Sequence, residues 1–148
     1  MNTPDPNRLE KLCSAGPVVL EAGGSSMGKR YPAEAGVRFR VRQLERRRPL
    51  PGTILVFQDA AGRIVAHRLI ASATRFGAFR HYTKGDGNKR VDPSIVPERQ
   101  FIAEAVAVVR GGTETDLTTL PRRFGGLVLA TVALPRLAWQ AWRRSSDV

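Results

Sequence analysis

Residues 51–69 read PGTILVFQDAAGRIVAHRL, and this stretch decides the fold. Pro51 and Gly52 precede an apolar run from Thr53 to Gln58, which predicts a β-strand. Residues 59–62, DAAG, have the composition of a hairpin turn. Residues 63–74 are again rich in apolar side chains and predict the returning strand. The sequence therefore predicts a β-hairpin over residues 53–74.

Further short strands are predicted on both sides of this hairpin. Residues 37–42 alternate apolar and basic side chains, so Val37, Phe39 and Val41 share one face and are expected to point inward. The remaining expected elements are a short helix over residues 8–14, strands over 17–22, 76–83 and 101–110, and a long loop over 84–97. Thr118 or Thr119 is suited to cap a helix with Pro121 in its first turn. This order predicts a mostly β fold, a barrel-type antiparallel sheet with a C-terminal helix.

The composition is that of one globular domain. The chain has 148 residues, of which 42% are hydrophobic and 25% charged. The single cysteine, Cys13, excludes an internal disulfide and a multi-cysteine metal site, and two histidines leave little for zinc. We expect Cys13 to be a buried thiol and the protein to need no cofactor.

The chain is strongly basic. Its 24 Lys and Arg against 13 Asp and Glu give a net charge of +11. This charge suits an anionic membrane surface or nucleic acid, and it also fits a genome in which arginine is common. The arginines at 46–48 and at 38, 40 and 42 would be the footprint of the alternative function, a basic β module without catalytic activity that binds nucleic acid or an anionic surface. Few aromatic residues accompany these arginines, so stacking on single strands is poorly supported and a nucleic-acid partner is not favoured.

Three separate segments carry the groups that nucleophilic acyl transfer needs. They are GGSSM at 23–27, VAHRL at 65–69 and TKGDGNKRVD at 83–92. Such chemistry requires a hydroxyl, a base that takes its proton and a third group that orients the base. Ser26 and His67 are the candidates for the first two, and Asp86 and Asp92 for the third. An ordinary turn serine, a core histidine and a turn-capping Asp86 are the corresponding structural interpretations.

Alternatives exist for several of these positions. Ser25 is a second hydroxyl in the same turn, and Lys84 is a lysine-type base if the histidine is not used. The N–H of Ser26 is suited to an oxyanion hole. His81 lies between Arg80 and Tyr82 and is expected to be a surface or strand residue.

The same segments resemble those of type I signal peptidases. GGSSM is similar to the nucleophile box of that family, residues 51–69 to its proline-glycine strand pair, TKGDGNKRVD to its aspartate box, and residues 101–112 to its closing strand. The resemblance covers about residues 22–112. It implies a LexA and signal peptidase-like fold and, because a histidine-arginine pair stands at the base position, the Ser-His-Asp branch. It further implies Ser26 as nucleophile, His67 as base, Asp92 as the orienting carboxylate and Asp86 as a residue that holds the loop, with Ser25 and Met27 at the oxyanion and substrate cleft.

The implied function is a serine endopeptidase that cleaves signal or leader peptides after small residues. The sequence departs from the family pattern between Met27 and Gly36, where proline comes late at Pro32 and valine follows Gly36, and at Gly24, where the family often has a hydroxyl. A self-cleaving repressor related to LexA would need a DNA-binding segment, for which residues 1–16 are too short. The expected organisation is a polar N-terminal lead over 1–16, the β catalytic domain over 17–112 and the C-terminal helix over 113–148.

The segment from Phe124 to Trp142 is the most apolar part of the chain. Arg136 and Gln140 interrupt it, and pairs of arginines flank it at 122–123 and 143–144. A helix here can span a bilayer, lie at its interface or cover the sheet. Because residues 1–12 contain no apolar run, we expect this helix to be the element that associates the protein with an anionic membrane surface. A helix that covers the sheet would instead leave a cytoplasmic enzyme.

Overall fold

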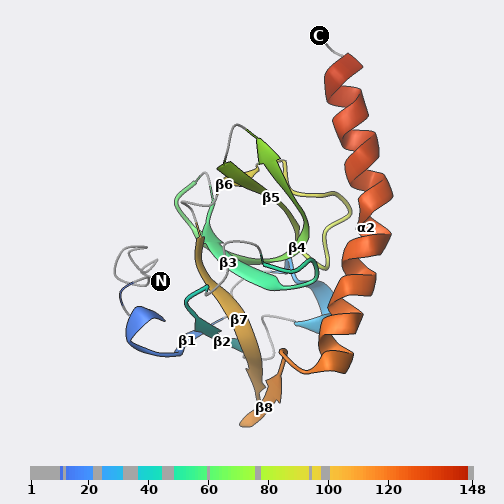
Figure 1. Ribbon diagram of the computed structural model, residues 1–148. Coiled ribbons are helices and arrows are strands. Elements are labelled where there is room, and N and C mark those ends of the chain that lie inside the picture. The colour runs from blue at the N-terminus through green and yellow to red at the C-terminus, as the bar shows by residue number, and fades with distance from the viewer. Residues whose placement is uncertain are drawn as a thin grey trace.

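A computed structural model describes residues 11, 13–21, 25–31, 37–44, 49–59, 61–75, 78–93, 95–97 and 101–146 (Figure 1). Among the sequence features discussed above, Gly23, Gly24, residues 32–36, the arginines at 46–48 and Gly77 lie outside this set. Of the helix expected over 8–14, Lys11 and residues 13–15 are described and are helical.

The described strands form one antiparallel sheet. Its strands are β1 (Val18–Glu21), β2 (Arg38–Arg42), β3 (Ile54–Gln58), β4 (Ile64–Arg75), β5 (Ala78–Lys84), β6 (Val96–Pro97), β7 (Phe101–Arg110) and β8 (Thr113–Asp116). The spatial order is β1-β2-β7-β3-β4-β5-β6, and β8 pairs with β7. The sheet curves strongly, and helix α2 (Leu120–Ser146) runs along one side of it (Figure 1). The prediction of a mostly β protein with a C-terminal helix is confirmed.

The predicted hairpin is β3 and β4. Gln58 pairs with Ile64, and Ile54 with Arg68. In the turn, the Asp59 carboxylate accepts the N–H groups of Ala61 and Arg63, both at 2.9 Å, and the Gly62 N–H bonds back to the Asp59 carbonyl. The aspartate thus replaces the backbone partners that a tight turn leaves unpaired.

Strand β3 is covered on both faces because alternate side chains enter different clusters. Ile54 and Val56 pack in one core with the inward side chains of β2, Val37, Phe39 and Val41, as the alternation predicted. Leu55 and Phe57 pack in a second cluster with Leu69 and Val96. Cys13 is buried in the first core, as expected for a structural thiol, and burial raises the pKa of that thiol.

Two strands and one burial pattern were not predicted. Strand β8, with the sequence TETD, carries the sheet past residue 112, and β6 pairs with β5 inside the expected loop. His81 is a strand residue, but a surface position for it is wrong. Its side chain is fully buried, and its Nδ1 lies 2.8 Å from the Ser72 hydroxyl.

Helix α2 starts where expected. The Thr119 carbonyl accepts the N–H groups of Arg122 and Arg123, and the Asp116 carboxylate accepts the N–H of Thr118. The helix meets β4 through Ala130 and Ala133, which pack on Ile70. In the part of the chain that the structure describes, no helix is both long enough and apolar enough to cross a membrane.

Candidate active site

The serine segment forms a compact turn at the end of β1. The Gly28 N–H bonds to the Ser25 carbonyl at 2.8 Å, and residues Gly28–Arg30 form a short 3-10 helix. Met27 is buried in the first core at 5% exposure, whereas Ser26 is half-buried and Ser25 exposed. The buried methionine therefore fixes the turn, and the hydroxyl of the preceding residue remains partly accessible.

The aspartate loop packs directly on this turn. The Gly87 N–H donates to the Ser26 carbonyl at 2.8 Å. A Cβ at Gly85 would lie 2.4 Å from the same carbonyl oxygen, and one at Gly87 would lie 2.7 Å from the Gly28 Cα. Real Cβ atoms do not approach so closely, so only glycine permits this contact. The two glycines of TKGDGN thus join segments about sixty positions apart in the sequence.

His67 is held by a carboxylate of the same loop. Its Nδ1 lies 2.7 Å from Asp92 Oδ2, and the Thr83 hydroxyl donates to that oxygen at 2.7 Å. The Asp92 N–H in turn bonds to the Thr83 carbonyl at 2.9 Å. An ionised carboxylate only accepts hydrogen bonds, so Nδ1 carries the proton and Nε2 of the neutral ring is left as the basic nitrogen. This pair lies mostly out of water, at 12% and 15% side-chain exposure.

Asp86 has a different partner. Both of its oxygens bind the guanidinium of Arg68, from Nε at 2.7 Å and from Nη2 at 2.6 Å. The remaining Arg68 nitrogen, Nη1, donates to the Gly52 carbonyl at 2.6 Å. Burial by itself lowers the pKa of Arg68, but the hydrogen bonds and charge of Asp86 outweigh it, and the pKa is raised. Of the two carboxylates left open by their spacing, Asp92 therefore contacts His67 and Asp86 contacts Arg68.

A small cavity borders Ser26. Its volume is about 80 Å³, and most of its walls are apolar. It is bounded by β1, the serine turn and the start of β4, and its lining includes Leu20, Met27, Phe39, Val56, Ile64 and Ala66. The space suits a small apolar group.

Ser26 and His67 are both described, and no hydrogen bond joins their side chains. Ser26 borders the cavity together with Val65 and Ala66, the two residues before His67. The His67 ring packs edge-on against Phe57, with centroids 6.2 Å apart. Hydrogen bonds between nucleophile and base are often long before substrate binds, so the approach of Ser26 Oγ to His67 Nε2 stays a prediction. Lys84, the alternative base, donates from Nζ to the Gly85 carbonyl at 3.2 Å.

Two residues of the site had no assigned role in the sequence interpretation. Thr83 supports the orienting carboxylate, and Arg68 ties the aspartate loop to the turn before β3. Both lie inside the quoted segments, TKGD and HRL, so their positions were visible. Their partners were not visible, since they depend on how β4 and β5 pair.

The arginines of β2 offer little free charge for nucleic acid. Arg40 forms an ion pair with Glu114, and Arg42 one with Glu104 at 2.8 Å. The described residues also include no cluster of three or more histidine, cysteine or acidic side chains that could hold a metal ion.

Comparison of the chain with models of protein families, with curated proteins and with solved structures finds no match. What the protein does is therefore inferred from its own residues.

Proposed function

We propose that the protein is a serine endopeptidase in which Ser26 is the nucleophile, His67 the general base and Asp92 the residue that orients the base. The observation that carries this proposal is the 2.7 Å contact between His67 Nδ1 and Asp92, in a loop that also packs on the Ser26 turn. A carboxylate on one nitrogen sets the tautomer that leaves the other nitrogen basic.

The chemistry follows from this tautomer. Nε2 of His67 takes the proton of Ser26 as Oγ attacks the scissile carbonyl, and Asp92 stabilises the imidazolium that forms. The N–H of Ser26 donates to the oxyanion of the tetrahedral intermediate. His67 then gives its proton to the leaving amine, and the amide bond breaks to leave an acyl ester on Ser26. Water, deprotonated by His67, hydrolyses the ester and regenerates the hydroxyl.

The substrate we propose is a signal or leader peptide cleaved after a small residue. The cavity of about 80 Å³ beside Ser26 suits a small apolar side chain next to the scissile bond. Strand β1 is at one end of the described strand order and leads directly to the serine turn. An extended peptide can add to such an edge through main-chain hydrogen bonds, which places its carbonyl groups along the strand that ends at the nucleophile.

The finer fold assignment belongs to the same proposal. A strongly curved antiparallel sheet, a central hairpin that carries the base and a glycine-rich aspartate loop on the nucleophile turn suit a LexA and signal peptidase-like barrel. The resemblance of residues 22–112 to type I signal peptidases supports this assignment.

The decisive test is labelling with a serine-reactive fluorophosphonate or penem probe, followed by mass spectrometry of the modified peptide. We expect one adduct on Ser26. Ser26→Ala and His67→Ala should abolish labelling, and Ser25→Ala, the matched control in the same turn, should retain it. Peptides with alanine before the cleaved bond should be cut, and the same peptides with leucine there should not. A folded wild-type protein that neither labels nor cleaves would refute the proposal.

A further inference from the structure

Helix α2 packs on the sheet with its smallest residues and leaves its largest residues outside. Ala130 and Ala133 are buried at 2% and 3% exposure, and a Cβ on Gly126 would lie only 2.6 Å from the Gly52 carbonyl oxygen. The large side chains are exposed, with Leu120 at 84%, Phe124 at 67%, Val132 at 64% and Trp139 at 51%. A helix whose only task was to cover the sheet would bury these residues instead.

The exposed side chains form one continuous surface, which we call the α2 face. Its members are Leu120, Phe124, Leu127, Val128, Val132 and Trp139, all on the side of the helix away from Ala130 and Ala133. Thr131 is the polar residue within this face, and its hydroxyl donates to the Leu127 carbonyl at 2.9 Å. The face therefore presents no hydroxyl that needs water, a property suited to hydrocarbon.

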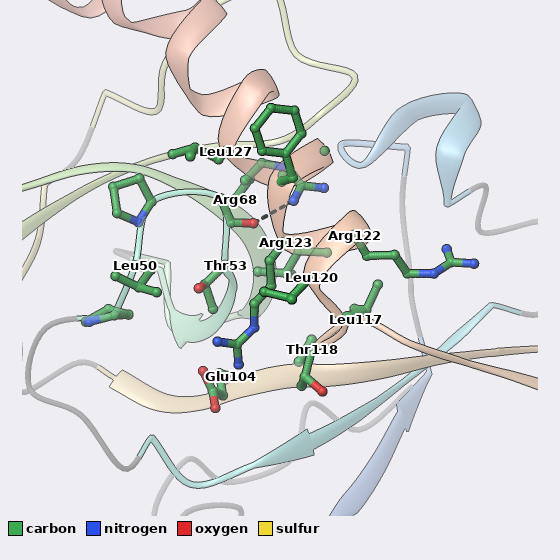
Figure 2. A pocket seen from close by; sticks show the side chains of 18 of the residues that line it. Leu50, Thr53, Arg68, Glu104, Leu117, Thr118, Leu120, Arg122, Arg123 and Leu127 are labelled. Carbon is green, nitrogen blue, oxygen red and sulfur yellow. Dashed lines mark hydrogen bonds between the residues drawn. The ribbon is translucent and has the colours of Figure 1, made fainter.

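A groove extends the α2 face toward the sheet. It has a volume of about 990 Å³ and lies between the first two turns of α2 and the turn that precedes β3. Leu50 and Thr53 approach it from the turn, and Leu120 and Leu127 approach it from the helix (Figure 2). Its size is at the upper end of ligand pockets, which are typically roughly 300–1,000 Å³. An acyl chain or the apolar part of a lipid fits such a space.

Basic side chains border the same groove. Arg122 and Arg123 line it from the first turn of α2, which contains no acidic residue (Figure 2). Cations at a helix N-terminus oppose the helix dipole and reduce the stability of the helix. Two arginines at that position are therefore better explained by an anionic ligand than by folding.

From these observations we infer that the α2 face and its groove bind an anionic lipid bilayer. The helix lies in the plane of the membrane with the α2 face toward the acyl chains, and Arg122 and Arg123 meet the phosphate groups. The net charge of +11 favours the same surface. Because Gly126 and Ala130 fix the helix to the sheet, the bound membrane would hold the whole β body in one orientation. This inference is independent of catalysis, and Ser26→Ala should bind lipid like the wild type.

Vesicle flotation of the full chain tests this inference. We expect binding to vesicles of phosphatidylglycerol and phosphatidylcholine and little binding to phosphatidylcholine alone. A basic residue near an anionic surface contributes about 1 kcal/mol, or roughly fivefold in affinity. Arg122→Glu with Arg123→Glu should therefore weaken binding at least 25-fold, since each substitution removes attraction and adds repulsion. Phe124→Ser with Val132→Ser should weaken it at least tenfold without unfolding, because both side chains are exposed.

Matched controls separate this surface from general charge and hydrophobicity. Arg38→Glu with Arg110→Glu changes the net charge equally on exposed strand positions, and Val19→Ser removes an apolar side chain that is 45% exposed. These variants should lose little beyond the general charge effect. A bimane label at Leu50→Cys, in the groove, should be quenched by lipids with brominated chains, and a label at Val19→Cys should not.

Three outcomes would overturn the inference. The first is that wild-type protein does not float with anionic vesicles. The second is that the α2-face variants bind as well as their controls. The third is that light scattering finds a dimer that Phe124→Ser dissociates, because a second copy of the chain would then cover the face.

Discussion

Replacement of Arg68 by methionine probes the contact that connects the aspartate loop to the rest of the fold. Arg68 and Asp86 are exposed by only 5% and 11%, and both carboxylate oxygens bind the guanidinium. Arg68→Met keeps most of the side-chain volume and leaves the Asp86 carboxylate buried without a counterion. It also leaves the Gly52 carbonyl without its donor.

The expected loss of stability follows from this burial. Removing one partner of a buried ion pair costs about 3–5 kcal/mol. For a domain of this size the melting temperature should fall by roughly 10 °C or more. Adding Asp86→Leu removes the stranded charge, so the double variant should retain only the penalty of the unpaired Gly52 carbonyl, about 1–3 kcal/mol. The second substitution should therefore partly rescue the first.

Urea unfolding of the two single variants, the double variant and the wild type measures these differences. Arg63→Met is the matched control, since Arg63 also belongs to the β3–β4 hairpin and pairs with Asp59 but is 72% exposed. Exposed pairs contribute about 0–1 kcal/mol, so this control should unfold almost like the wild type. The reasoning is refuted if Arg68→Met loses no more stability than Arg63→Met, or if Asp86→Leu adds its full cost to that of Arg68→Met.

Three further predictions concern the site and the helix. Asp92→Asn should lower kcat on a leader peptide by roughly 10⁴-fold with little change in KM, because the amide no longer selects the catalytic tautomer of His67. Gly126→Ala should lower the melting temperature through overpacking of about 1–3 kcal/mol, since its Cβ would lie 2.6 Å from a backbone carbonyl, whereas Gly125→Ala, with nothing within 4 Å, should not. Hydrogen bonds from the Thr118 side chain and backbone, with nearby arginines, lower the pKa of Asp116 below its ordinary 3.8, so the carboxylate stabilises the fold above that pH and the benefit is lost as pH falls through the lowered value. The difference in melting temperature between wild type and Asp116→Asn, measured against pH, should therefore disappear in acid.

Local patterns were sufficient for most of the fold. The hairpin of β3 and β4, the inward residues of β2 and the start of α2 each follow from a few neighbouring residues, through turn chemistry, alternation or capping. Strand β8 could not be predicted in this way because its sequence, TETD, has no apolar residue, and it is a strand because it pairs with β7. The burial of His81 likewise depends on Ser72 of the neighbouring strand, which no local pattern identifies.

The helix illustrates a second limit of sequence reasoning. Apolar residues occur on all sides of α2, so its hydrophobic pattern did not show which side meets the sheet. The structure resolves this by size rather than polarity. Gly126 fits against Gly52 where no larger residue can, and the alanines one and two turns later continue that contact. Close packing therefore selected the small residues, and the large ones remained outside.

The two carboxylates of the aspartate loop show how neighbouring residues of one strand divide a site. His67 and Arg68 are adjacent on β4 and point to opposite faces of the sheet. Asp92 reaches His67 on one face, while Asp86 reaches Arg68 on the other. The spacing of the carboxylates left both open as partners of the histidine, and strand parity alone does not assign them. What assigns them is the path of the loop, since Gly85 and Gly87 hold its first half against the Ser26 turn and the Thr83 carbonyl holds Asp92 beside β5. One loop thus fixes the base through Asp92 and the nucleophile turn through its glycines, so a change that moves the loop should disturb both together.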